Sequence, residues 1–316
     1  MTSSTGHSSS GRMGRSLQRI GQKILGYWQA NYRCLTRDPK LFCLGKLGRF
    51  EVVRDLVCYL SRSSSRLIYL DNAKASVFKD PDVDRVVDSL RTKGVYLGIN
   101  LPENLQQKIL RYAYATPCFA DRSRQVKFAY PQKEEMESKL GRQIEIGCYA
   151  NEDYPTVFGL ATNAGLMAIA AKYLGAAPVY IGSELMWSFP YSATWKQKLK
   201  QAQVFHYDLD DYRSIKFFFY LTPVSPTTGA HVCVQGSHRN KKLRHQILGQ
   251  RCASISDKKL IREYDSENVL KICGPASFGF VEDTCCFHKG AVPETGDRLM
   301  LQLEFALNRY DNLRAA

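Results

Sequence analysis

The chain has 316 residues, of which 44% are hydrophobic and 23% are charged. This composition is typical of a globular protein with a sizeable core, and it excludes a chain that is disordered throughout. The formal net charge is +14, but the basic residues lack the interleaved aromatic side chains of single-strand nucleic-acid binders. We therefore predict no nucleic-acid partner. We interpret the surplus charge as a solvated basic surface, with a preference for anionic substrates as the alternative.

The cysteines and the apolar stretches indicate the environment of the chain. Ten cysteines are scattered without a C-x-x-C pair, which suits reduced thiols and a cytoplasmic location better than a secreted, disulfide-rich fold. The most apolar stretch, residues 164–171, is stopped by Lys172 and is too short to cross a bilayer. We therefore expect no membrane span.

The N-terminal part is predicted to be an extension outside the main domain. Residues 1–14 are rich in Ser and Gly and predict a flexible tail. Apolar residues then recur at spacings of three and four, so residues 15–80 are interpreted as a basic helical extension. An acid-free basic start is also typical of organellar import signals, which leaves import open beside an ordinary docking helix.

Helical patterns dominate the first half of the main domain. Pro102 suits the first turn of a helix, while Asn163 and Gly175 suit the start and the end of another. The elements predicted here are helices over residues 83–90 and 163–174, a helix that Pro102 opens, and a strand over residues 94–99; a further helix over residues 50–60 belongs to the predicted extension.

From about residue 203 onward the hydrophobic period changes to two, which indicates strands. Residues 214–221 carry aromatic side chains on both faces and predict a central strand that is covered on both sides. Residues 298–307 alternate cleanly, with leucines on one face and Arg298 among the residues of the other. The whole pattern predicts an α+β fold, an antiparallel sandwich or barrel with helices on its outside.

The motif with the clearest chemistry is His206-Tyr-Asp208. The chain has no P-loop, no G-x-S-x-G and no H-E-x-x-H motif. On an extended strand His206 and Asp208 point to the same side, and together they supply two thirds of a 2-His-1-carboxylate triad for non-haem Fe(II). His288 follows 80 residues after Asp208, and Arg298 opens the last strand. A buried Arg298 would be costly unless it held a carboxylate such as that of 2-oxoglutarate.

Residues 206–239 (HYDLDDYRSIKFFFYLTPVSPTTGAHVCVQGSHR) and 278–305 (FGFVEDTCCFHKGAVPETGDRLMLQLEF) carry a family resemblance. They resemble the phytanoyl-CoA dioxygenase-like family of Fe(II)/2-oxoglutarate-dependent oxygenases. The resemblance extends over roughly residues 85–310, which places the oxygenase domain at residues 81–316.

The resemblance implies a double-stranded β-helix, or jelly roll, flanked by helices. It implies that His206, Asp208 and His288 bind Fe(II) and that Arg298 binds the distal carboxylate of 2-oxoglutarate. With O₂, such an enzyme hydroxylates a small organic or acyl substrate and releases succinate and CO₂. Halogenating relatives lack the carboxylate ligand, so the presence of Asp208 predicts hydroxylation, or a desaturation or ring closure, without halogenation.

Each candidate also has an ordinary structural interpretation. His206 and Asp208 could be a surface pair, His288 a core histidine, and Arg298 an ion-pair partner of Asp297 or Glu304. A lysine in a buried central strand needs a carboxylate, so Lys216 is predicted to bind 2-oxoglutarate or the substrate, or to be structural. Other residues with mainly structural interpretations are His231, His238, His245 in a basic solvated loop or lid, Asp210 as a register alternative to Asp208, and the packing residues Cys285 and Cys286.

Two other functions stay open at the sequence level. One is a jelly-roll binding or scaffold protein whose metal site is vestigial. The other is a non-oxidative cupin-like metalloenzyme, for which Arg298 would have no required role. The identity of the substrate and the oligomeric state do not follow from the sequence.

Overall fold

The computed structural model describes residues 10–64, 68–69, 76–78, 82–150 and 154–310. The chain divides into two compact units, the first of Met1–Leu47 with Tyr310–Ala316 and the second of Gly48–Arg309. The first contains helices α1 (Ser10–Arg37) and α2 (Pro39–Leu47). Helix α1 begins at Ser10, inside the predicted flexible tail, and no proline interrupts it. The remainder of that predicted tail, residues 1–9, lies outside the described residues.

The second unit begins at Gly48, well before the boundary predicted near residue 81. Helix α3 (Glu51–Leu60) belongs to this unit because its side chains bond to a distant loop. A carboxylate oxygen of Glu51 accepts a hydrogen bond of 2.6 Å from the backbone N–H of Lys241. The guanidinium of Arg54 donates one of 2.7 Å to the carbonyl of His238.

Most helices of the second unit precede its longest strands. The α-helices are α5 (Val83–Lys93), α6 (Glu103–Ala115), α7 (Lys133–Leu140), α8 (Pro155–Ala161), α9 (Ala164–Leu174), α10 (Trp195–Lys200), α11 (Leu243–Leu248) and α12 (Asp257–Tyr264). Short 3₁₀ turns are η2 (Tyr130–Gln132), η3 (Gly249–Ser254) and η4 (Ser266–Asn268). Among the described helices none is long and apolar enough by itself to cross a membrane. Helices α8 and α9, which are bent by 43° relative to each other, reach the required length and apolar composition only when they are counted as a pair.

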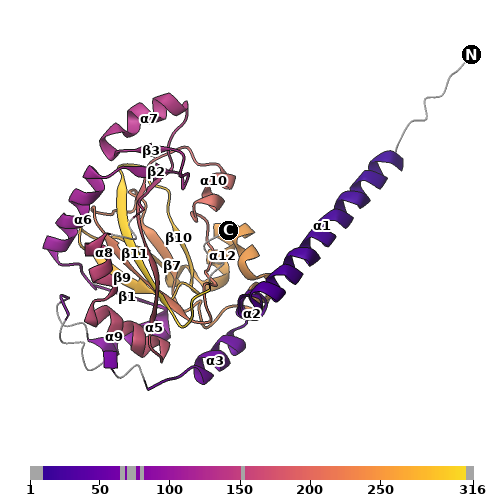
Figure 1. Cartoon of the computed structure of the whole chain (residues 1–316), viewed down its shortest axis with the longest axis horizontal. Coiled ribbons are helices and arrows are strands. Elements are labelled where there is room, and N and C mark those ends of the chain that lie inside the picture. Colours follow the sequence, from indigo (N-terminus) through magenta and orange to yellow (C-terminus); the bar gives the residue numbers. More distant parts are fainter. Residues whose placement is uncertain (1–9, 65–67, 70–75, 79–81, 151–153, 311–316) are drawn as a thin grey trace, which may run out of the picture. The chain divides into compact units, whose positions relative to one another are not determined.

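The strands form two antiparallel sheets (Figure 1). The major sheet has eight strands in the order β1 (Val95–Leu97), β9 (Gly279–Glu282), β6 (Ser214–Tyr220), β11 (Arg298–Ala306), β5 (Val179–Ser188), β4 (Ile146–Cys148), β2 (Cys118–Ala120) and β3 (Lys127–Phe128). The minor sheet has three strands in the order β10 (Phe287–Gly290), β7 (His231–Val234) and β8 (Val269–Ile272). The predicted α+β jelly-roll class is therefore confirmed.

Several helices begin or end at the capping residues that the sequence contains. The side chain of Asn163 caps α9 by accepting hydrogen bonds from the N–H groups of Gly165 and Leu166. Gly94 and Gly175 follow α5 and α9 in the left-handed conformation, with φ of +77° and +80°. Residues other than glycine adopt this conformation at a cost, which explains why both helices stop there.

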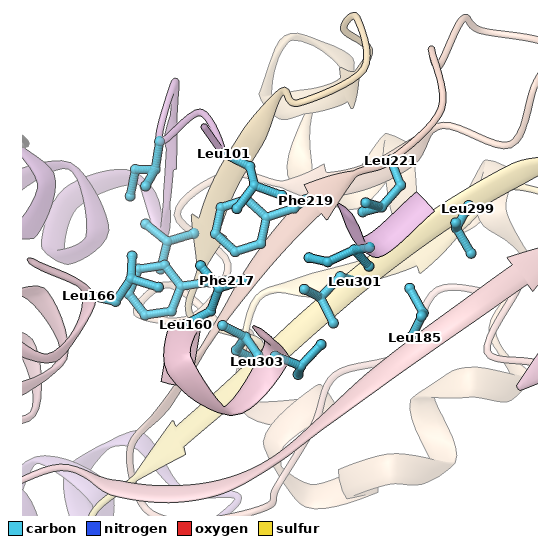
Figure 2. Packing of buried hydrophobic residues seen from close by; sticks show 14 of the residues in the cluster. Leu101, Leu160, Leu166, Leu185, Phe217, Phe219, Leu221, Leu299, Leu301 and Leu303 are labelled. Carbon is cyan, nitrogen blue, oxygen red and sulfur yellow. The ribbon is translucent and has the colours of Figure 1, made fainter. Parts of the chain in front are cut away.

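The two faces of strand β11 have different surroundings. Its leucines face α8, α9 and the other covering helices, where Leu299, Leu301 and Leu303 are fully buried with Phe217 and Phe219 of β6 (Figure 2). The opposite face of β11 and β6 lies toward the minor sheet. That face begins with Arg298, which is 3% exposed. The predicted alternation therefore places one face in the core and the other toward the site.

We expect Leu301→Ala to lower the free energy of unfolding by about 2–5 kcal/mol, because the truncation removes buried contacts and leaves a cavity. Urea denaturation followed by circular dichroism measures this change. The matched control is Leu243→Ala, since Leu243 is 65% exposed and its loss should change stability by less than about 0.5 kcal/mol. Equal losses in the two variants would contradict the packing described for β11.

Candidate active site

The structure brings the three predicted metal ligands together. His206 and His288 lie opposite each other in an antiparallel bridge, with N–H to carbonyl distances of 3.0 Å and 2.8 Å in the two directions. Asp208 is held two residues further on, where its N–H donates to the carbonyl of Thr284 at 2.9 Å. One possible ligand atom from each of the three side chains lies within 4.8 Å of the other two.

The orientation of both imidazole rings suits metal binding. The Nδ1 atom of His206 lies 2.9 Å from the carbonyl of Val204, and that of His288 lies 3.0 Å from the carbonyl of Cys286. Each Nδ1 can therefore donate its proton to the backbone, which leaves the Nε2 lone pair free for a metal. Both Nε2 atoms lie 3.7 Å from oxygens of Asp208. A set of two imidazole nitrogens and one carboxylate fits Fe(II) with open coordination positions.

The electrostatics favour the protonation states that a metal requires. Burial and, to a smaller extent, the neighbouring His206 lower the pKa of His288 to about 4, so His288 is neutral at physiological pH. Burial raises the pKa of Asp208, but Lys216 and the two histidines more than offset this, and the pKa lies below its usual range. A neutral imidazole and an ionised carboxylate can bind a divalent cation without first losing a proton.

Arg298 is a buried cation that forms no ion pair with any described carboxylate. Its guanidinium donates to the hydroxyl of Ser188 at 2.8 Å and to the carbonyl of Gly229, while its Nε has no partner. Of the two predicted acidic partners, Asp297 accepts a hydrogen bond from Tyr130 instead, and Glu304 lies beside Lys216. Burial lowers the pKa of Arg298, as expected for a cation without a neighbouring anion.

Lys216 has the carboxylate partners that its burial requires, and the chain itself supplies them. Its ammonium lies 2.7 Å from Asp208, 3.0 Å from Asp210 and 3.7 Å from Glu304. Lys216 therefore holds one carboxylate oxygen of Asp208 in place. The predicted role of Lys216 in binding 2-oxoglutarate or substrate stays a prediction. Asp210, the register alternative, contacts Lys216 and is not grouped with the two histidines.

One pocket of about 210 Å³ is lined by the three predicted metal ligands together with Lys216 and Arg298. Sequence analysis missed much of its wall, in particular Glu184 and Arg122, which form an ion pair. Gln302 donates to Glu184 at 2.6 Å and belongs to the same face of β11 as Arg298. The alternation of β11 could have identified Gln302, whereas no local signal indicated Arg122 or Glu184.

The other histidines among the described residues are held by contacts within the chain, although His231 also lines the pocket. His231 lies 2.7 Å from Glu282, and burial lowers its pKa to about 3. His238 contacts the thiol of Cys286. The prediction for His245 was wrong: it is 1% exposed and bonds to Tyr264 at 2.8 Å, because the basic stretch around it forms α11 instead of a solvated loop. Cys285 and Cys286 are buried packing residues, as predicted.

No family model matches the chain, and no curated protein matches it in sequence. Among solved structures, EctD from S. alaskensis in its apoform is similar, with a TM-score of 0.52 and 16% sequence identity over 75% of this chain and 81% of that chain. EctD with 2-oxoglutarate and 5-hydroxyectoine gives a TM-score of 0.51 and 14% identity over 75% of this chain and 80% of that chain. This chain therefore has the same fold as EctD, which agrees with the jelly roll implied by the family resemblance in its sequence.

Proposed function

We propose that the chain is an Fe(II)/2-oxoglutarate-dependent oxygenase that hydroxylates a small organic or acyl substrate. The observation that supports this most is the shared pocket, in which three metal-ligand side chains and an unneutralised buried arginine face the same cavity. A similar solved structure, EctD, holds 2-oxoglutarate. Fe(II) and 2-oxoglutarate, when bound, would couple decarboxylation of the 2-oxo acid to oxidation of a C–H bond by O₂, with release of succinate and CO₂.

Different residues of the pocket would bind the metal and the cosubstrate. His206, Asp208 and His288 would hold the metal, and Lys216 fixes the second oxygen of Asp208. Arg298 would hold the distal carboxylate of 2-oxoglutarate through two parallel N–H donors. The small pocket with Glu184, Arg122 and Gln302 in its wall favours a compact substrate with polar groups over a long apolar chain.

The two other functions lack this support. A scaffold protein with a vestigial site has no need for a complete ligand set whose imidazoles are both oriented by backbone carbonyls. A non-oxidative metalloenzyme gives no reason for Arg298 to be buried without an anion, which is costly. A cytoplasmic location, with organellar import as the alternative, stays a prediction from the sequence.

An anaerobic titration with Fe(II) and 2-oxoglutarate, followed by visible absorbance, tests the proposal without knowledge of the substrate. We expect a charge-transfer band that requires both components and that saturates at one equivalent of Fe(II). A protein that binds Fe(II) but gives no band with 2-oxoglutarate would contradict the proposed cosubstrate. A protein that binds no Fe(II) would favour the scaffold function.

The proposed reaction excludes halogen transfer, because Asp208 would take the coordination position that a halide needs. We expect no halogenated product when substrate, 2-oxoglutarate and excess chloride or bromide are supplied, as measured by product mass spectrometry. The Asp208→Gly variant is the comparison in which such a product could arise. A halogenated product from the unmodified chain would show that Asp208 is not a metal ligand.

A further inference from the structure

A second pocket, of about 510 Å³, lies elsewhere in the same unit and shares no lining residue with the iron pocket. Helices α3, α5 and α9, which are labelled together in the lower part of Figure 1, contribute to its wall. Its lining contains five arginines against two aspartates, Asp55 and Asp283. The arginines are Arg54, Arg62, Arg91, Arg213 and Arg239.

The two aspartates do not neutralise this charge. Asp283 is buried and accepts hydrogen bonds from the hydroxyl of Tyr173 and from the N–H of Cys285. Asp55 reaches one guanidinium only, that of Arg213, at 3.6 Å with its own side chain 67% exposed. A formal charge of +3 therefore remains on the wall of a concave site.

Arg54 is a buried cation in the wall of this pocket. Its side chain is 8% exposed, and it donates to two carbonyls, those of His238 at 2.7 Å and Gly48 at 3.4 Å, instead of to a carboxylate. Despite burial, the nearby Asp283 and Glu51 raise its pKa, so they offset part of its charge without pairing with it directly. The charge that a ligand can neutralise therefore lies mainly on the exposed arginines of the pocket.

Three guanidiniums at the rim are available to a ligand. Arg62, Arg91 and Arg239 are exposed, and none of them forms an ion pair with a described residue. Arg62 lies over the ring of Tyr59, with 5.3 Å to the centroid, which limits the positions that it can take. Arg239 donates to the backbone carbonyl of Arg91 at 3.4 Å, so its guanidinium lies against the last turn of α5. Clustered like charges in a cleft repel each other and raise the local concentration of anions.

We propose that this pocket binds the phosphate group of a small phosphorylated molecule. A phosphate dianion offsets more of the positive charge than a single carboxylate does, and its oxygens accept paired N–H donors from more than one guanidinium. The pocket is larger than a phosphate group alone, and Tyr59 and Tyr212 in its wall offer aromatic surface to the rest of such a molecule. The site is independent of the iron chemistry proposed for the other pocket.

Calorimetric titration of the full chain, metal-free and without 2-oxoglutarate, with inorganic pyrophosphate tests the proposal. We expect saturable binding at one equivalent. Arg62→Ala/Arg91→Ala should weaken it by at least about a hundredfold, because two charge-assisted contacts are lost. Arg91→Lys keeps the charge but loses the planar pair of donors and should give an intermediate affinity.

The matched control is Arg111→Ala/Arg124→Ala, which removes the same charge from exposed arginines outside the pocket and should leave the affinity within about twofold. Thermal melts check that all variants are folded. An absence of saturable binding to the unmodified chain, an equal loss in the control, or an equal affinity for citrate would each overturn the proposal. Binding to phosphatidic acid vesicles without binding to pyrophosphate would also overturn it, in favour of a membrane surface. These results do not depend on Fe(II), so they leave the proposed oxygenase function untouched.

Discussion

Replacing His288 with alanine is expected to abolish turnover and to lower Fe(II) affinity by more than a hundredfold. A facial triad has no spare protein ligand, and even partners outside the ligand set cost about 10–100-fold in metal affinity. The Nε2 atom of His288 lies 3.7 Å from Asp208, and its Nδ1 lies 3.0 Å from a backbone carbonyl. Among the described residues only His206 and Asp208 are grouped with it as possible ligands. Metal analysis after anaerobic Fe(II) loading and desalting measures the loss directly.

The matched control for His288→Ala is His238→Gln. His238 is also a buried histidine, and its Nδ1 contacts the thiol of Cys286 instead of a carboxylate. This variant should bind one equivalent of Fe(II), while His206→Ala and Asp208→Ala should behave like His288→Ala. If the His238 variant lost iron and the His288 variant kept it, the assignment of the triad would be wrong.

The convergence of His206 and Asp208 was predictable because it requires only a locally extended backbone, on which residues two apart point to the same side. The prediction of a strand there was wrong, since His206 forms an isolated bridge and Asp208 follows it outside the named strands. The same rule separated Arg298 from the leucines of β11. The partner of His206 was less constrained, because only a long-range bridge places His288 opposite it. Here the family resemblance supplied what the spacing could not.

Strand β5 shows where sequence patterns fail. It is ten residues long and pairs with β11, yet its alternation is weak, and a register shift interrupts the pairing near Glu304. Strand β5 belongs to the sheet because it pairs with β11, and its own residue pattern does not reveal this. Glu184 and Ser188, which it brings into the pocket, were therefore not predicted.

The charge pattern of the sequence also did not predict the surroundings of individual charged side chains. Lys216 was predicted to need a carboxylate, but the sequence left open whether a ligand or the chain supplies it. Asp208, Asp210 and Glu304 surround it once the strands fold together. His245 sits in a basic stretch that resembles a loop, although Tyr264 and Glu263 hold its ring in a buried position. Net charge along a chain does not reveal which cations are neutralised, because ion pairs form between distant segments.

Replacing Arg298 with methionine is expected to raise the apparent dissociation constant for 2-oxoglutarate by about 10- to 150-fold while Fe(II) still binds. This range corresponds to the loss of a charge-assisted contact of about 1.5–3 kcal/mol. The anaerobic visible titration measures the affinity directly. Arg122→Ala is the matched control, since Arg122 lines the same pocket but forms an ion pair with Glu184. Its removal should leave the 2-oxoglutarate affinity nearly unchanged.

The stability of the ligand-free Arg298→Met protein separates a binding role from a structural one. A buried cation without an anion costs free energy, so an apolar side chain of similar length should keep or raise the melting temperature without 2-oxoglutarate. With saturating Fe(II) and 2-oxoglutarate the unmodified chain should have the higher melting temperature, because ligand binding stabilises it more than the variant. A variant that melts lower in both conditions and keeps its 2-oxoglutarate affinity would assign Arg298 to its hydrogen bonds with Ser188 and Gly229. Cosubstrate binding would then have to come from another cation of the pocket, and Lys216 is already committed to three carboxylates.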